Sequence, residues 1–163
     1  MKITSLWRIA RAPFADLRGE GARLYGGRWN PVGTPCVYAS TTLSLTALET
    51  LVHTDPDLLP PDLLAMELES GGLSLEEHDD DDHPAHWRLE LGQAETQAFG
   101  GRWSEEKRSA LLVLPSVVLP ADAGAAERNV VLNPLHPEAG SIRIVRQLPF
   151  TFDTRLVSER HQT

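Results

Sequence analysis

The sequence has few of the features that define several common protein classes. It contains one cysteine, Cys36, which excludes an internal disulfide and a multi-cysteine metal site. No apolar run approaches the roughly 20 residues that a membrane-spanning helix needs. Residues 1–10 are interrupted by polar side chains and lack the apolar segment of a secretory signal, so no signal peptide is predicted. We therefore expect a protein of the reducing cytoplasm.

Positive charge is also scarce. The 163 residues include 15 lysines and arginines against 23 aspartates and glutamates, which gives a formal net charge of −8. Domains that bind nucleic acid normally present a basic face, so direct nucleic-acid binding is not expected and a basic protein partner fits better. Hydrophobic residues make up 41% and charged residues 23%, as in an ordinary folded chain that is long enough for a real core.

Two nucleotide-binding fingerprints are missing. Gly19-Glu20-Gly21 begins like G-x-G-x-x-G, but Leu24 stands where the third glycine belongs, and no Walker A pattern occurs. About six short β-rich runs outnumber two helical segments, at 43–52 and 93–99. The runs lie at 3–9, 36–39, 63–68, 110–119 (divided by Pro115-Ser116), 129–132 and 142–145. This pattern predicts an α+β fold with a bent or split mixed sheet, in a single domain over residues 1–163 whose tail frays from about 157 onward.

The stretch from 24 to 53 concentrates most of the chemically capable side chains. Gly26 and Gly27 free the backbone just before Arg28, so the arginine is expected to leave a sharp turn. Tyr38 lies in the short apolar strand that follows. Leucines at helical spacing then predict an amphipathic helix over 43–52, with an apolar stripe that includes positions 48 and 52.

Glu49 stands beside the apolar stripe of this predicted helix, four residues before His53. No lysine or arginine occupies a helical i±4 position, so the carboxylate needs a partner from elsewhere in the chain or costs free energy. The simpler interpretation is a helical Glu49–His53 pair, which contributes roughly 0.2–0.5 kcal/mol. Glu49 and His53 could also bind a metal ion together, but no further metal-ligating side chains lie nearby in the sequence, so no metal site is predicted.

The order of these motifs resembles the RES domain, the toxin half of the Xre–RES bacterial toxin–antitoxin pair. The resemblance rests on GGRWN, on PxxYxS, on a helix with ALE and VH, and on a second block with LPS, NVVLNP and HP, over about residues 6–147. It implies a fold similar to ADP-ribosyltransferase toxins, in which NAD lies in a cleft between sheets. The arginine, glutamate and serine that name the family correspond to Arg28, Glu49 and Ser116.

The resemblance implies a catalytic set of Arg28, Tyr38, Glu49 and Ser116. Arg28 would hold the phosphates of NAD, and Tyr38 would position the nicotinamide ring. Glu49 would orient the ribose and favour departure of nicotinamide, while Ser116 would complete the contacts. Gly27 and Asn129 are added to the residues that line the NAD site. NAD is then a substrate, and neither a cofactor nor a metal is needed.

Each of these residues also has a structural interpretation. Arg28 could pair with a carboxylate or cap a helix, and Tyr38 could be a core tyrosine with a satisfied hydroxyl. Ser116 could bond to the backbone at a kink between strands. Asn129 is better explained as a residue that organises the backbone, whereas Trp29 and Asn30 are expected to fix the Arg28 turn.

The function implied by the resemblance is a toxin that degrades NAD and arrests growth. Water or phosphate would accept the ADP-ribosyl group, and an Xre-like helix-turn-helix antitoxin would block the cleft within a larger complex. Two alternatives remain open. One is a protein mono-ADP-ribosyltransferase, and the other is a non-catalytic module that binds nucleotide or antitoxin.

Two further motifs are predicted to lie outside the site. The acidic run at 76–83 has no EF-hand spacing and is interpreted as a solvated loop. A second GGRW, at 100–103, is followed by a polar turn at 104–108 rather than by a strand and a helix with a carboxylate. Trp103 is therefore expected to be a core residue.

Overall fold

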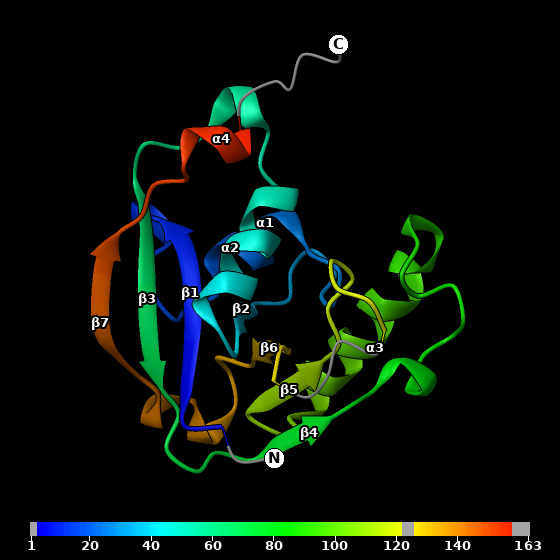
Figure 1. Cartoon of the computed structure of the whole chain (residues 1–163). Helices are drawn as coiled ribbons and strands as arrows, with labels where there is room; N and C mark the ends of the chain where they lie inside the picture. The colour runs from blue at the N-terminus through cyan, green and yellow to red at the C-terminus, as the bar shows by residue number, and fades with distance from the viewer. Residues whose placement is uncertain (1–2, 122–125, 158–163) are drawn as a thin grey trace.

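The computed structural model describes residues 3–121 and 126–157, and in these ranges seven strands form one mixed sheet (Figure 1). The strand order is β4-β5-β6-β2-β1-β3-β7. The strands are β1 (Ser5–Arg11), β2 (Val37–Ser40), β3 (Leu63–Glu69), β4 (Leu75–Glu77), β5 (Leu111–Leu114), β6 (Asn129–Leu132) and β7 (Arg143–Pro149). Neighbouring strands are antiparallel except for β4 and β5, which are parallel.

Four α-helices and five short 3₁₀ turns connect the strands in the described ranges. The helices are α1 (Glu20–Tyr25), α2 (Leu43–Val52), α3 (Gln93–Glu106) and α4 (Thr154–Val157). Helix α2 begins after Thr42, whose side chain accepts a hydrogen bond from the backbone N–H of Leu45 and caps the first turn. None of the described helices has the length and apolar character that crossing a membrane requires.

The sheet is split between β1 and β2. These two strands share one register pair, Trp7 with Ser40, whereas β1 pairs with β3 over seven residues. The halves diverge from this junction and enclose the main core between them (Figure 1). Buried side chains from both halves meet there, including Leu6, Val37, Met66, Leu68, Val113, Val130 and Leu132. The predicted α+β architecture with a bent or split mixed sheet is therefore confirmed.

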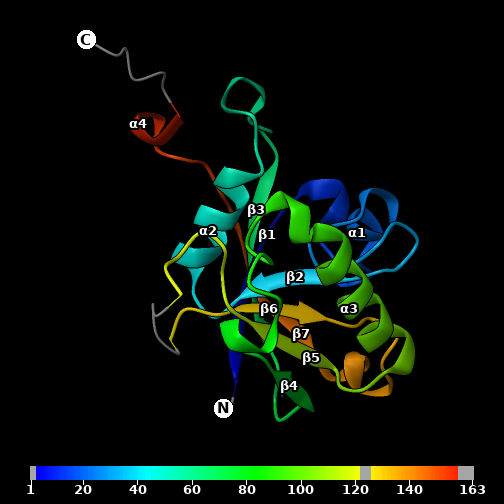
Figure 2. The ribbon, with the colours of Figure 1, turned by 90° about the vertical axis from the view of Figure 1, so that its right-hand side faces the viewer.

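A helix covers the outer face of each half, and Figure 2 shows β2 running between these two helices. Leu43, Ala47 and Leu51 of α2 pack on the half formed by β1 and β3. A second cluster, which contains Trp29, Trp87, Trp103, Leu112, Leu114 and Val131, fills the space under α3 on the other half. Burying each of these large apolar side chains contributes about 1.5–3 kcal/mol, which fixes both helices against the sheet.

Three segments differ from the sequence prediction. Residues 20–25, for which the sequence predicted neither a helix nor a strand, form α1. Residues 75–77, which include the first two residues of the acidic run, form β4, because they pair in parallel with β5. Residues 117–119 do not form the predicted strand, because the chain bends there and the Ser116 hydroxyl bonds to Glu49 of α2 and to the N–H of Val118.

Helix α3 is longer than predicted. It runs through the second GGRW and most of the predicted polar turn, and it ends before Lys107, which adopts a left-handed conformation with φ of 50°. In α2, Leu48 and Val52 are 41% and 61% exposed, so they lie outside the buried stripe to which the sequence pattern assigned them. At the C-terminus, residue 157 ends α4, and the remainder of the tail that was predicted to fray, 158–163, lies outside the described residues.

Candidate active site

Arg28 lies in a tight turn after α1, as the glycine pair predicted. Gly26 ends the helix with φ of 71°, a conformation that favours glycine, and the N–H of Gly27 donates to the carbonyl of Asn30 at 3.0 Å. The buried side-chain amide of Asn30 fills the turn and donates from Nδ2 to three backbone carbonyls, those of Ala22, Pro31 and Thr34. The turn is therefore held by its own sequence neighbours.

The Tyr38 hydroxyl holds the same turn from β2. It donates to Asn30 Oδ1 at 2.7 Å and accepts the backbone N–H of Trp29 at 3.0 Å. Burial raises the pKa of the Tyr38 phenol well above its usual range, which keeps the hydroxyl protonated as a donor. A Cβ on Gly27 would lie 2.5 Å from this hydroxyl, so the glycine makes room for Tyr38. Both residues thus have a structural task in the turn.

Helix α3 supports the turn from the opposite side. Thr96 Oγ1 donates to the carbonyl of Arg28 at 2.6 Å, and Gln97 Nε2 donates to the carbonyl of Gly27 at 2.8 Å. A Cβ on Gly100 would lie 1.8 Å from the carbonyl oxygen of Trp29, so only glycine permits this approach. The second GGRW is therefore part of the scaffold of the first. The signal that would have shown it is the helical spacing of positions 96, 97 and 100.

The Arg28 side chain is half-buried and is anchored at one nitrogen. Nη1 donates to the carbonyls of Trp87 at 2.9 Å and Leu89 at 3.5 Å. Within residues 3–121 and 126–157, Arg28 forms no ion pair with a carboxylate, and Nε and Nη2 make no hydrogen bond. The edge of the guanidinium formed by these two nitrogens is the one that binds phosphate or carboxylate in a bidentate manner.

Glu49 forms the centre of a second cluster. Its Oε1 accepts from Ser116 Oγ at 2.6 Å and from Asn129 Nδ2 at 2.5 Å, and Asn129 Oδ1 accepts from Ser40 Oγ at 2.9 Å. Its Oε2 lies 4.0 Å from Nε2 of His53, a side chain that is 72% exposed. The prediction that this carboxylate needs partners from elsewhere in the chain is confirmed, since Ser116 and Asn129 are 67 and 80 positions away.

The two clusters lie on the same face of β2. Tyr38 contacts the Arg28 turn, and Ser40 contacts Asn129, which holds Glu49. Side chains two positions apart on a strand point to the same face, at a separation of about 7 Å along the strand. The structure therefore places Gly27, Arg28 and Tyr38 in one cluster and Glu49, Ser116 and Asn129 in a second cluster.

A small hollow of about 10 Å³ adjoins the Glu49 cluster. It is lined by Pro115, Ser116, Leu119, Pro120, Ala121, Glu127 and Arg128. Pockets for drug-sized ligands measure roughly 300–1,000 Å³, so a whole dinucleotide would extend beyond this hollow. Cys36 is not a candidate nucleophile nearby, because burial raises the pKa of its thiol to about 12.

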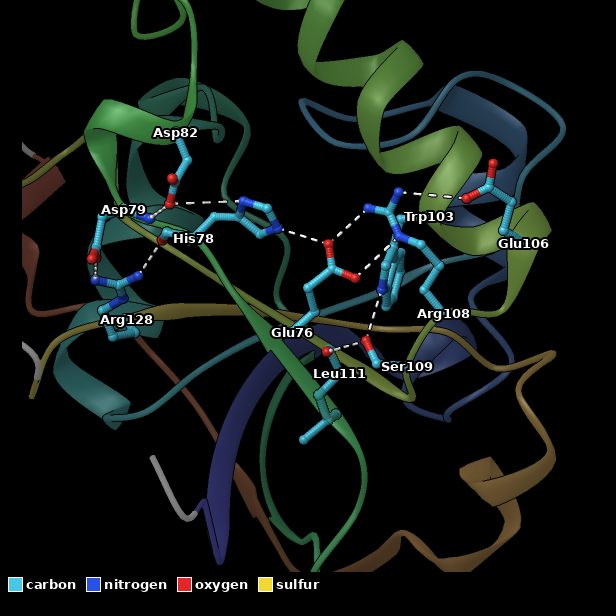
Figure 3. Close-up of polar contacts among 10 residues, drawn as sticks. All are labelled: Glu76, His78, Asp79, Asp82, Trp103, Glu106, Arg108, Ser109, Leu111 and Arg128. Carbon is cyan, nitrogen blue, oxygen red and sulfur yellow. Dashed lines mark hydrogen bonds and ion pairs between the residues drawn. The ribbon is translucent and has the colours of Figure 1, made fainter.

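The acidic run was predicted to be a solvated loop, but several of its side chains form ion pairs with arginines from other segments (Figure 3). Glu76 accepts hydrogen bonds from Arg108 and lies 2.7 Å from the ring of His78. Asp79 accepts from Arg128 at 2.7 Å, and the same guanidinium also donates to the carbonyl of His78. The arginines come from distant segments, which is why local spacing did not reveal them. Among the described residues, no group of three His, Cys, Asp or Glu side chains is arranged to hold a metal ion.

Trp103 lies beside this network and is fully buried. Its indole Nε1 donates to Ser109 Oγ at 2.8 Å, and this hydroxyl in turn donates to the carbonyl of Leu111 (Figure 3). A buried tryptophan with a satisfied N–H is a packing residue. The prediction of a core role for Trp103 is confirmed.

This fold has a solved counterpart. The chain is similar to the crystal structure of the M. tuberculosis MbcT–MbcA toxin–antitoxin complex, with a TM-score of 0.70 and 16% identity, over 91% of this chain and 84% of the matched chain. At this level of identity the likeness shows the fold alone. The class is therefore an α+β domain with a split mixed sheet, as in that solved structure.

Sequence comparison then shows the family. The RES domain matches residues 5–153, so this chain belongs to the RES domain family. It is 35% identical to the Prs ADP-ribosylating toxin of Sphingobium sp. (strain YBL2), over 94% of this chain and 97% of that protein. It is also 35% identical to Toxin Res of Photorhabdus laumondii, over 95% and 98% of the two chains. Toxin Res of Pseudomonas putida is 34% identical, over 93% and 98%. The resemblance noted in the sequence is confirmed, and the chain is a toxin of the RES family.

Proposed function

We propose that this toxin binds NAD and cleaves its nicotinamide N-glycosidic bond. The proposal rests mainly on the hydrogen bonds of the Glu49 carboxylate. Ser116 and Asn129 bind one oxygen of this carboxylate, and the other oxygen lies 4.0 Å from the exposed imidazole of His53. The Glu49 side chain itself is 22% exposed. A carboxylate oriented in this way through one oxygen keeps the second for a substrate hydroxyl.

The chemistry requires one bond to break. Nicotinamide is attached to the ribose as a positively charged ring, so it leaves as a neutral molecule when the bond between the ribose carbon and the ring nitrogen breaks. The ribose then develops oxocarbenium character, which a nearby carboxylate stabilises electrostatically. Water or phosphate adds to the same carbon and yields ADP-ribose or its phosphate. No metal or further cofactor is needed for this step.

Arg28 is suited to the diphosphate of NAD. Its Nη1 is fixed by two backbone carbonyls, so the guanidinium is oriented in advance and its Nε–Nη2 edge is left for two phosphate oxygens. The Tyr38 hydroxyl is committed to the turn, so we assign to Tyr38 a contact with nicotinamide through its ring. Gly27 and Asn129 then act by shaping the turn and by holding Glu49.

An antitoxin is the proposed protein partner. The solved counterpart comes from a toxin–antitoxin complex, and the net charge of −8 on this chain suits a basic partner. We propose an Xre-like helix-turn-helix antitoxin that covers the Glu49 cluster and forms a larger complex with the toxin. The same negative charge disfavours direct binding of this chain to nucleic acid.

Release of nicotinamide from NAD tests the proposal. The purified protein is expected to release nicotinamide in the absence of any protein substrate, either with water alone or with added phosphate. Glu49→Gln should remove this activity, whereas Glu105→Gln, at an exposed position of α3, should retain it. A folded parent protein that binds NAD but releases no nicotinamide under either condition would instead be a non-catalytic binding module.

A second candidate function is ADP-ribosyl transfer to a protein. It is favoured by one specific observation, the 35% identity to a relative named as a Prs ADP-ribosylating toxin. The two functions share the bond that breaks and differ in the acceptor. Incubation of a lysate with NAD labelled in its adenylate half separates them. Label on a protein band indicates transfer, whereas free labelled ADP-ribose or its phosphate indicates degradation.

A further inference from the structure

The segment from Trp87 to Leu89 lies between the Arg28 turn and the Glu49 cluster. On one side, the carbonyls of Trp87 and Leu89 accept both hydrogen bonds of Arg28 Nη1. On the other side, the Arg88 side chain reaches the loop that carries Ser116. Consecutive residues of this segment therefore bond to Arg28 in the first cluster and to the Ser116 carbonyl in the second.

All three guanidinium nitrogens of Arg88 donate hydrogen bonds. Nη1 donates to the carbonyls of Ser116 at 3.0 Å and Leu119 at 2.8 Å. Nε and Nη2 donate to the two carboxylate oxygens of Asp80 at 2.6 and 3.0 Å, which fixes the plane of the fork. The guanidinium also lies 5.0 Å from the ring centroid of Trp87, and the side chain is 24% exposed.

Among the described residues, the loop that receives these bonds makes few other hydrogen bonds, although Val117 packs against the cluster under α3. Pro115 and Pro120 lack a backbone N–H, and residues 117–119 have no strand partner. The Ser116 hydroxyl accepts the N–H of Val118 at 3.0 Å and donates to Glu49 at 2.6 Å. The direction of this hydroxyl, and through it the orientation of Glu49, therefore depends on how the carbonyls of the loop are held.

We propose that Arg88 is a positioning residue of the active site. It holds the Ser116 loop so that the serine hydroxyl orients Glu49, and its own backbone segment holds Arg28. This inference rests on the proposed function for its effect on rate, although the effect on the loop does not depend on it. A simpler role for Arg88 would be to pair with Asp80 and stabilise the acidic run.

Arg88→Lys separates the two roles. Lysine keeps the positive charge beside Asp80 but lacks the planar fork that reaches the carbonyls of Ser116 and Leu119. Arg102→Lys, at an exposed position of α3, is the matched control. We expect kcat for nicotinamide release to fall by about 10- to 100-fold in Arg88→Lys, the range produced when a catalytic group is displaced by up to about 1 Å. The control should retain the rate of the parent.

Hydrogen exchange of the Val118 amide gives a readout that is independent of NAD. This amide donates to Ser116, so in Arg88→Lys it should exchange at least about 10-fold faster, while amides of the β5 and β6 core keep their protection. In a Ser116→Ala background, the loss of rate caused by Arg88→Lys should be smaller than in the parent, because Arg88 acts through that serine. Asp80→Asn provides a second, milder variant that should change the Val118 amide in the same direction.

Unchanged Val118 exchange in Arg88→Lys would overturn the positioning role. So would a loss of rate that is equal in the parent and Ser116→Ala backgrounds. If the parent protein releases no nicotinamide, the proposed function fails, and the exchange of Val118 still decides whether Arg88 holds the loop.

Discussion

The Arg28 turn and the Glu49 cluster are built in different ways. Most of the hydrogen bonds that hold the turn come from two side chains nearby in the sequence, Asn30 and Tyr38, and Thr96 and Gln97 of α3 add one bond each. The Glu49 cluster is held by bonds between side chains that lie 67 to 89 positions apart. We infer that the turn is a scaffold and that the cluster is the proposed site of chemistry. Variants of the turn should mainly cost stability, and variants of the cluster should mainly cost activity.

The largest effect on activity is expected for Glu49→Gln. The amide keeps the size of the side chain but loses the negative charge that stabilises the ribose cation, so nicotinamide release should fall on the order of 10²–10³-fold, as when one electrostatic group is removed from an active site. Thermal unfolding should change little, because the side chain is partly exposed. A variant with the parent rate, or one that is toxic on expression, would contradict the assignment of Glu49.

Gly100→Ala is the strongest test of the scaffold. In an ordinary helix interior this change stabilises by about 1 kcal/mol. Here the added Cβ would lie 1.8 Å from the carbonyl oxygen of Trp29, so α3 and the Arg28 turn must separate, at a cost of about 3 kcal/mol or more. Urea unfolding measures the difference. Gly71→Ala, where an added Cβ meets no atom within 4 Å, is the control, and equal stability of the two variants would reject the close approach.

Tyr38→Phe should have a smaller effect, again on stability. It leaves Asn30 Oδ1 and the Trp29 N–H without their partner, which costs about 1–3 kcal/mol. The ring remains, so the rate of nicotinamide release by the folded protein should stay close to that of the parent. Tyr25→Phe, at a side chain that is 77% exposed, is the control. Unchanged stability together with a large loss of rate would instead give the hydroxyl a direct role in catalysis.

The smallest expected effect is a loss of stability in mild acid. Burial, together with the nearby His78, lowers the pKa of His83 below 6.5, and Asp82 and Asp80 oppose this shift. A histidine with a lowered folded-state pKa contributes stability that is fully present above the unfolded pKa and is lost as pH falls through the folded value. Melting temperatures should therefore begin to drop as pH falls below about 6.5.

His83→Phe provides the matched variant for this measurement. It keeps an aromatic ring beside Trp29, Trp87 and Phe99 and removes the titrating group. The decline just below pH 6.5 should be flatter in the variant than in the parent. The same slope in both proteins would show that other groups cause it.

The sequence predicted what depends on local spacing. Paired glycines before Arg28 indicated a turn, and the absence of a base near Glu49 in its helix indicated a distant partner. The resemblance to the RES family then supplied Arg28, Glu49 and Ser116 as a set. The structure adds that Ser116 and Asn129 hold the same oxygen of Glu49.

The sequence did not predict the residues that act from a distance. Thr96 and Gln97 reach the turn from α3, and Arg88 reaches the Ser116 loop, across separations of 28 to 70 positions. The helical spacing of positions 96, 97 and 100 marks one face of α3 but not the segment that it contacts, and the contact of Arg88 leaves no periodic signal. The acidic run was misinterpreted for the same reason, because its partners Arg108 and Arg128 come from other segments.

A crystal structure of the Glu49→Gln variant with NAD shows whether Arg28 and Glu49 hold the two ends of one NAD molecule. The variant should bind NAD without consuming it. We expect the diphosphate to contact Nε and Nη2 of Arg28, and the nicotinamide ribose to lie within hydrogen-bonding distance of the side chain at position 49. A complex in which NAD lies away from either residue would contradict the account.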